Sequence, residues 1–160
     1  MESFTKLFIT TILVIFATSC KRENDTETSL AGTWEYSIEI SFEGTNYNTN
    51  QSISETKKFS GVFTWDEGLD GWLEGDIEYS YLMGHLDEGQ LGFTEDNFRW
   101  SENGKEYEAF CIWNSVPATN STKEFTTKSG MYSWVEVTYP DGNEIFCTDV
   151  DATLKARKIE

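Results

Sequence analysis

The chain has 160 residues, of which 28 are acidic and 12 are basic, so its formal net charge at neutral pH is −16. A chain with this charge is repelled by phosphate backbones and anionic membrane surfaces, which excludes nucleic acid as an expected partner. Aromatic residues make up 15% of the chain and only 2 residues are proline, a composition that favours β-strands.

The N-terminal residues have the three zones of a secretory signal. Lys6 supplies a positive charge, residues 7–17 form an apolar run, and residues 17–19 are small. The apolar run is shorter than the roughly 20 residues that a membrane-spanning helix needs. We therefore expect a signal peptide over residues 1–19, with a retained membrane anchor as the alternative.

The segment Ala17-Thr18-Ser19-Cys20 resembles the lipobox of bacterial lipoproteins. In that family the chain is cut before the cysteine, which then receives acyl chains. The resemblance implies that Cys20 is acylated and that the membrane is a partner through these chains, although Ala17 stands where leucine is commonest in the family. Several acyl chains give firm anchoring, since each buried methylene contributes about 0.8 kcal/mol.

The residues after Cys20 are charged and polar, so we expect residues 20–29 to form a flexible tether. This stretch is similar to a surface-export signal of Gram-negative lipoproteins, in which a lysine and acidic residues follow the lipidated cysteine. Lys21, Glu23 and Asp25 occupy such positions. The resemblance implies an outer-membrane lipoprotein on the cell surface, with the periplasmic face as the alternative.

Residues 30–42 carry the clearest strand pattern. Large apolar residues from Trp34 to Phe42 share one parity, and Glu or Ser takes the other, which predicts one buried face and one wet face. Further strands are predicted over residues 58–65, 72–83, 90–94, 98–101, 107–113, 131–139 and 144–154. Gly61 marks a bend or bulge in the strand over residues 58–65, and the polar residues 114–129 form the longest loop.

These elements predict one all-β domain over residues 30–160, an antiparallel up-and-down meander of about eight strands. Closure into a small barrel and folding as a β-sandwich are the two alternatives.

The segment Leu30-Ala31-Gly32-Thr33-Trp34 resembles the G-x-W signature that opens the first strand of lipocalins. The resemblance implies a lipocalin-like barrel in which Trp34 plugs one end and Gly32 leaves room for the chain to enter. It also implies that a basic residue near the C-terminus packs over the indole, for which Arg157 is the candidate. Avidin-like barrels begin with a similar segment and remain an alternative.

Two cysteines remain beside Cys20. In an oxidising location this even number predicts one disulfide between Cys111 and Cys147, with two free buried thiols as the alternative. The predicted strand order conflicts with this bond, because a whole strand separates the two cysteines. Two strand spacings are about 9.6 Å, whereas the Cα atoms of a disulfide lie within about 6.8 Å.

No catalytic group, metal centre or cofactor is predicted. His85 is the single histidine, so no histidine-based metal cluster or Ser-His-Asp triad can be assembled, and no glycine-rich phosphate loop occurs. The acidic residues are too numerous for any pair of them to indicate a hydrolase.

The function that the sequence favours is that of a non-enzymatic surface lipoprotein that binds a small apolar or amphipathic ligand inside the barrel. The wall residues expected from strand parity are Tyr36, Ile38, Phe63, Tyr79, Tyr81 and Met83. A structural or protein-interaction domain of a surface complex, with a packed interior and a protein partner, is the second hypothesis. A hydrolase with paired acids is the third.

Overall fold

The computed structural model describes residues 29–78, 80–94 and 96–160, and these ranges are built from strands and turns. They contain no helix that is long and apolar enough to span a membrane. The predicted signal peptide, Cys20 and all of the tether except Ser29 lie outside the described residues. In chain order the strands are β1 (Gly32–Asn46), β2 (Gln51–Trp65), β3 (Asp70–Gly75), β4 (Ser80–Asp87), β5 (Gln90–Phe93), β6 (Asp96–Glu102), β7 (Lys105–Cys111), β8 (Val116–Pro117), β9 (Glu124–Lys128), β10 (Trp134–Thr138), β11 (Glu144–Cys147) and β12 (Asp149–Lys158).

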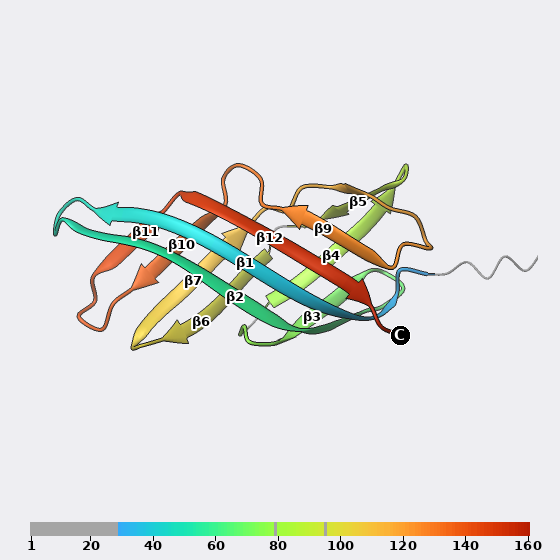
Figure 1. Cartoon of the computed structure of the whole chain (residues 1–160), viewed down its shortest axis with the longest axis horizontal. Helices are drawn as coiled ribbons and strands as arrows, with labels where there is room; N and C mark the ends of the chain where they lie inside the picture. The colour runs from blue at the N-terminus through green and yellow to red at the C-terminus, as the bar shows by residue number, and fades with distance from the viewer. Residues whose placement is uncertain (1–28, 79, 95) are drawn as a thin grey trace, which may run out of the picture.

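Strands β1 and β2 form a hairpin that runs along most of the molecule (Figure 1). The hairpin lies within an eight-stranded antiparallel sheet with the order β8-β5-β4-β3-β2-β1-β12-β9. The edge strands β8 and β9 contact each other, so this sheet curls until it is nearly closed. The antiparallel all-β meander predicted from the sequence is therefore confirmed, with a nearly closed barrel as its larger part.

A second antiparallel sheet has the order β11-β10-β7-β6. It packs against the half of the β1–β2 hairpin that lies near the connecting turn, while β3, β4, β5 and β9 lie around the other half (Figure 1). Backbone hydrogen bonds of 2.8 and 3.0 Å between Glu78 and Arg99 join the two sheets. A second connection is covalent, because only Thr148 separates β11 from β12.

The strand β1 alternates as the sequence predicts. Trp34, Tyr36, Ile38, Ile40 and Phe42 are all buried, and the residues between them are partly or fully exposed. The partner strand β2 begins at Gln51, seven residues before the predicted start at residue 58. The added stretch is polar, which is why its strand character is not visible in the sequence pattern.

The predicted strand over residues 72–83 is wrong in one respect, because it is two strands with different parity. Ile77 and Ser80 are both buried although three positions separate them, so the alternation breaks between β3 and β4. The side chain of Asp76 accepts hydrogen bonds from the backbone and hydroxyl of Ser60, which ends the pairing of β3 with β2. Tyr81 and Met83 consequently lie on the outer face of β4, not on the predicted inner face.

Gly61 does not mark a bulge but a close approach of two strands. A Cβ atom at this position would lie 1.9 Å from the carbonyl oxygen of Glu74 on β3, so only glycine fits. The continuous register of β1 and β2 runs through Gly61 without interruption.

The Gly32-Thr33-Trp34 segment begins β1 beside the C-terminus, where the N–H of Thr33 donates to the carbonyl of Glu160 at 3.1 Å. Trp34 is fully buried, and its indole N–H donates to the carbonyl of Leu30 at 2.9 Å. Gly32 has a φ of +132°, and a Cβ atom here would lie 2.3 Å from the carbonyl oxygen of Glu160. Glycine is therefore required by both the backbone conformation and the close approach of the C-terminus.

The basic residue beside Trp34 is Lys158, which corrects the prediction for Arg157. Lys158 lies opposite Trp34 in the β1–β12 register, and its ammonium donates to the carbonyls of Ser29 and Ala31 at 2.7 and 2.5 Å. Arg157 is opposite Glu35 and forms an ion pair with it at 2.6 Å on the outer face. Since alternate residues of a strand point to opposite faces, a shift of one position moves the predicted contact outside.

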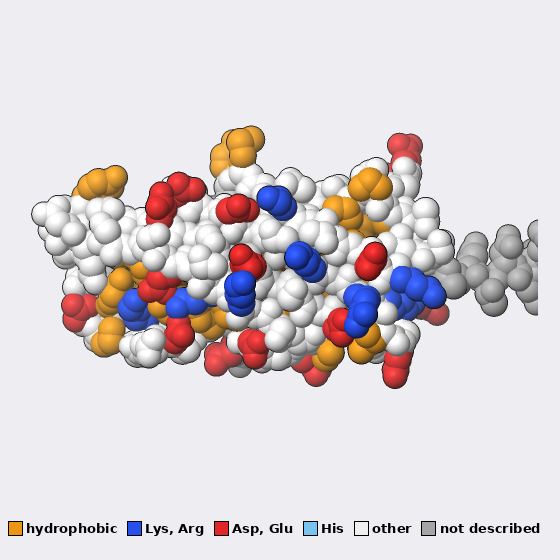
Figure 2. All heavy atoms as spheres, in the orientation of Figure 1, with side chains coloured by type: hydrophobic (Ala, Val, Ile, Leu, Met, Phe, Trp, Pro, Cys, Tyr) orange, Lys and Arg blue, Asp and Glu red, His pale blue; other side chains and the backbone are white. Residues whose placement is uncertain are grey.

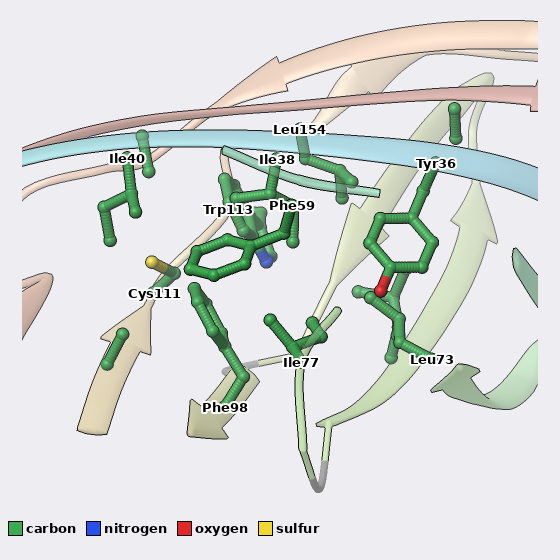
Figure 3. Packing of buried hydrophobic residues seen from close by; sticks show 14 of the residues in the cluster. Tyr36, Ile38, Ile40, Phe59, Leu73, Ile77, Phe98, Cys111, Trp113 and Leu154 are labelled. Carbon is green, nitrogen blue, oxygen red and sulfur yellow. The ribbon is translucent and has the colours of Figure 1, made fainter. Parts of the chain in front are cut away.

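Aromatic rings fill the core on both sides of its middle. The half near the termini holds Trp34, Phe63, Trp65, Phe93 and Phe125, with ring centroids 5.0 to 6.5 Å apart. The other half holds Phe42, Phe59, Phe98, Trp100 and Tyr107 at 4.7 to 6.3 Å. Figure 3 shows the region between them, where the side chains of Ile38, Phe59, Ile77 and Phe98 point toward one another.

The edge of β2 near the turn carries charges that point inward. Residues 51–59 pair with β1 but, within the described part of the chain, with no strand on their other side. Glu55 and Lys57 share the parity of buried Phe59; they pair with each other at 2.8 Å, while Glu55 also pairs with Lys105 and Lys57 with Glu102. Inward charges of this kind are one way in which proteins block the addition of a strand at an open edge.

The predicted disulfide between Cys111 and Cys147 is not formed, and both residues are free, buried thiols. Val135 of β10 pairs with Cys147 on one side and with Ala109 of β7 on the other, so β10 separates the two cysteines. Two strand spacings amount to about 9.6 Å, beyond the reach of a disulfide. Burial raises the pKa of both thiols, that of Cys147 to about 11.

One carboxyl group is buried in the middle of the core. Asp96 is 1% exposed, its Oδ1 accepts a 2.7 Å hydrogen bond from the hydroxyl of Ser80, and its Oδ2 has no partner among the described residues. Burial raises the pKa of Asp96 from 3.8 to about 6. The neighbouring titratable groups, the Cys111 thiol and the Tyr36 hydroxyl, also have raised pKa values, through burial first and in part through Asp96, so both stay neutral around pH 6.

Reduction is expected to leave the stability of the domain unchanged. In a chain carrying Cys20→Ser, the Tm should agree within about 1 °C with and without dithiothreitol, since no disulfide is lost. Thiol titration should find both cysteines reactive in denaturant and unreactive in the native state. A Tm that falls by several degrees on reduction would contradict the free-thiol structure.

Asp96→Asn is expected to stabilise the domain at neutral pH. The difference between pKa values of 3.8 unfolded and about 6 folded corresponds to about 3 kcal/mol. This stability is present below about pH 4, where both states are protonated, is lost as the pH rises to about 6, and does not change further above it. Urea unfolding across this range should show the decline in the natural chain but not in the variant. An unchanged pH profile in the variant would mean that other groups cause the decline.

Candidate functional site

The structure separates the six predicted wall residues into two groups and leaves one outside its described part. Tyr36, Ile38 and Phe63 face the core as predicted and are buried. Tyr81 and Met83 lie outside, as described above, and Tyr79 is not among the described residues. The two groups therefore do not line a common space.

The interior is filled by side chains. Figure 3 shows Tyr36 and Leu73 on one side and Phe59, Phe98 and Trp113 on the other, with aliphatic side chains between them. The clefts of the described chain open on the outer surface. The candidate ligand sites of the described residues accordingly lie on the outer surface.

One outer cleft combines aromatic rings with carboxylates. It has a volume of about 360 Å³, and we call it the Trp72 cleft. Its outward-facing lining comes from three adjacent strands and consists of Val62, Thr64, Asp70, Trp72, Glu74 and Tyr81.

Trp72 and Tyr81 form the aromatic wall of this cleft. They are directly opposite each other in the β3–β4 register, and their ring centroids lie 4.9 Å apart at an angle of 56°. The indole of Trp72 is 60% exposed, although the other tryptophans are buried or half-buried. An exposed tryptophan held in place by a cross-strand partner is a feature of binding surfaces, where Trp and Tyr supply much of the affinity.

A tight turn places Asp70 at the rim of the Trp72 cleft. The Asp66 carboxylate accepts hydrogen bonds from the backbone N–H groups of Gly68 and Asp70, at 2.8 and 3.1 Å. Leu69 adopts a φ of 62° in this turn and is buried, which ties the turn to the core. The acidic and glycine residues of the turn, noticeable in the sequence, thus have a structural role that also orders the site.

The cleft is electronegative. Within the described chain, none of Asp66, Asp70 and Glu74 forms an ion pair with a basic side chain. Partial burial raises the pKa of Tyr81, and the Asp70 carboxylate near its hydroxyl raises it further, so Tyr81 stays protonated at neutral pH. Carboxylates next to an open indole face suit a cation that also has apolar surface.

Hydrolysis by an acid pair fits this cleft poorly. Such a mechanism needs one carboxyl group as a proton donor and a second that is free to attack or to activate water. The Asp66 carboxylate is engaged by two backbone N–H groups of its own turn. Of the three carboxylates in the cleft, Asp70 and Glu74 are the two that remain available to a ligand.

A larger groove of about 820 Å³ lies on the outer face of β2, β1, β12 and β9. Figure 2 looks onto the face that carries β1, β2 and β12, where acidic and basic side chains are interspersed. The charges of this groove compensate each other, as in the Glu35–Arg157 ion pair, and its outward positions include Ser37, Ser60 and Thr126. No aromatic ring presents an exposed face there, so the smaller Trp72 cleft is the better candidate.

The described residues contain no group of three or more His, Cys, Asp and Glu side chains that could hold a metal ion. The single histidine, His85, lies exposed on β4 opposite Gly92. We therefore assign no metal site within residues 29–78, 80–94 and 96–160.

Trp72 was not among the residues predicted from the sequence. The available signal is the alternation in Gly71-Trp72-Leu73-Glu74. Trp72 shares the parity of the charged Glu74, which is the parity expected to face outward. Of Trp72 and Leu73, Leu73 is the buried residue. The parity of β4 does not help to place Trp72, because the alternation of buried residues changes after Ile77.

The chain matches no protein-family model and no curated protein. The geometry of the site and the N-terminal sequence are accordingly the basis for a functional inference.

Proposed function

We propose that this protein is a non-enzymatic binding module, anchored in the outer membrane by acyl chains on Cys20, that holds a small amphipathic cation in the Trp72 cleft. The observation that carries the ligand proposal is the open Trp72 ring, fixed against Tyr81 beside carboxylates that have no cation of their own. The proposed ligand class is a quaternary or protonated amine that carries apolar groups.

The size of the cleft limits the ligand. A volume of about 360 Å³ lies at the lower end of the range for small-molecule sites, so it holds one compact cationic group and its nearest carbons. A cation over an indole contributes about 0.5–2 kcal/mol, depending on how far it is removed from water. Asp70 and Glu74 add attraction that depends on salt concentration.

The anchor is supported by the sequence alone. Residues 1–19 have the signal-peptide layout, Ala17-Thr18-Ser19-Cys20 resembles a lipobox, and the polar residues after Cys20 suit a tether. The buried Trp34 at the start of β1 and the glycine required at position 32 support a relationship to lipocalin-like barrels. In this proposal the ligand binds to the outer wall instead of the barrel interior, because the interior is filled.

Choline is expected to bind the Cys20→Ser chain with a Kd of about 1 mM or weaker, as one cation–π contact with nearby carboxylates allows. Its uncharged carbon isostere, dimethylbutanol, should bind at least about tenfold more weakly, since tenfold is 1.4 kcal/mol. Titration followed by the backbone amide signals of β3 and β4 in NMR spectra measures both affinities, and it also works in variants that lack the Trp72 indole.

Two variants serve as controls for this titration. Trp72→Ala should abolish the choline response and change the free energy of unfolding by less than about 1 kcal/mol, because the ring is exposed. Trp134→Ala, which removes a tryptophan on another surface, should leave the response intact. Equal binding of choline and dimethylbutanol, or binding that survives Trp72→Ala, would overturn the cation proposal.

A variant that lacks Cys20 and carries a cleavable signal peptide of a secreted protein in place of residues 1–19 is expected to be released from the membrane. When expressed in a Gram-negative host, the natural chain should fractionate with the outer membrane and have the mass of a chain that begins at an acylated residue 20. The variant should be soluble. An unprocessed chain that begins at Met1 and carries no acyl group would contradict the anchor.

A further inference from the structure

The outer face of the second sheet carries three aromatic rings in a row. Phe110 of β7, Trp134 of β10 and Phe146 of β11 lie on adjacent strands, and we call them the aromatic ladder. The centroids of Phe110 and Trp134 are 5.7 Å apart at 17°, and those of Trp134 and Phe146 are 5.2 Å apart at 32°. Phe146 is 54% exposed and the other two rings are half-buried, so the ladder presents an apolar surface to solvent.

The turn before β10 carries two further exposed apolar side chains. Met131 and Tyr132 are 81% and 82% exposed, yet the backbone that carries them is fixed. The N–H of Gly130 donates to the carbonyl of Ile112 at 2.6 Å, and the Ser133 hydroxyl accepts from the N–H of Ile112 and donates to the carbonyl of Gly130. Figure 1 shows this turn as the loop between β9 and β10 that stands out from the body of the domain.

Carboxylates flank the aromatic ladder. Glu106, Glu108, Glu136 and Glu144 share the outer face of the same three strands. Glu108 and Glu136 are directly opposite each other in the β7–β10 register, a like-charge arrangement that costs stability. Among the described residues, Glu136 has no cationic partner, and Glu108 has only Arg99, at 2.9 Å on its other side.

We propose that the aromatic ladder is the docking surface for a segment of a partner protein in which lysine or arginine alternates with apolar side chains. The apolar side chains would lie on Trp134 and Phe146, and a cationic side chain would lie between Glu108 and Glu136. Charge complementarity identifies the occupant as cationic. A cation bound between Glu108 and Glu136 would offset the repulsion of these two carboxylates, and this adds to the free energy of binding.

A second copy of the chain is excluded as the occupant by the same argument. Each copy has a net charge of −16 and would bring the same carboxylates to the interface. This inference goes beyond the proposed function and does not depend on it, since the aromatic ladder and the Trp72 cleft share no residue.

The test uses the Cys20→Ser chain and a fluorescently labelled hexapeptide in which lysine alternates with leucine, with anisotropy as the readout. A matched peptide with glutamate in place of lysine should not bind. Trp134→Ala and Phe146→Ala should each raise the Kd of the lysine peptide about tenfold or more, whereas Trp72→Ala should change this Kd less than about twofold.

Two double variants distinguish binding to the carboxylates of the ladder from attraction to the acidic surface as a whole. Glu108→Gln combined with Glu136→Gln should weaken the lysine peptide about tenfold. Asp87→Asn combined with Glu124→Gln removes the same charge from β4 and β9, which belong to the other sheet, and should change the Kd less than about twofold. Since Phe146 is the most exposed ring, its variant keeps the test valid if Trp134→Ala fails to fold.

Three outcomes would overturn the proposal. The first is equal weakening by both charge pairs, which would show attraction to the whole surface and not to the ladder. The second is binding that survives both ladder variants. The third is a dimer in sedimentation velocity that Trp134→Ala dissociates, which would show that the ladder is covered by a second copy.

Discussion

The structure depends on the row of large side chains on the inner face of the β1–β2 hairpin. The second sheet and the curled remainder of the first sheet pack against this one face, with Trp34 among the rings near the termini and Phe42 among those near the turn. Because one continuous register fixes both strands, the two halves of the core cannot shift independently. A ring removed from such a core costs about 3–5 kcal/mol, a large part of the stability of a small domain.

Regions with one buried and one wet face could be predicted from the sequence. The strand β1 is correct in parity at every inward position, because five large apolar residues alternate with polar ones. The start of β2 could not be found in this way, since its inward positions include Glu55 and Lys57, which satisfy each other as an ion pair. The sequence also does not show which of Arg157 and Lys158 lies beside Trp34. That depends on the register between β1 and β12, which the local sequence pattern does not determine.

The candidate sites were less accessible to sequence analysis than the fold. Alternation indicates which residues face inward but not whether the interior contains a cavity. In this protein the aromatic side chains of opposite walls contact each other and fill the interior. Residues on the outer face are then the candidates for ligand binding. The sequence does not show whether a tryptophan at such a position is covered by neighbouring side chains or exposed to solvent. Trp72 and Trp134 stand out only when the cross-strand partners of each ring are known.

The inward ion pairs at the open edge of β2 have a consequence for crowding. At high local concentration, the open strand edges of neighbouring molecules can pair with each other. An approaching strand would have to pair with residues 51–59, whose side chains Glu55 and Lys57 already bind Lys105 and Glu102 across the gap. Insertion would break these bonds and leave charges without partners. The domain can therefore reach a high local concentration without edge-to-edge association at β2.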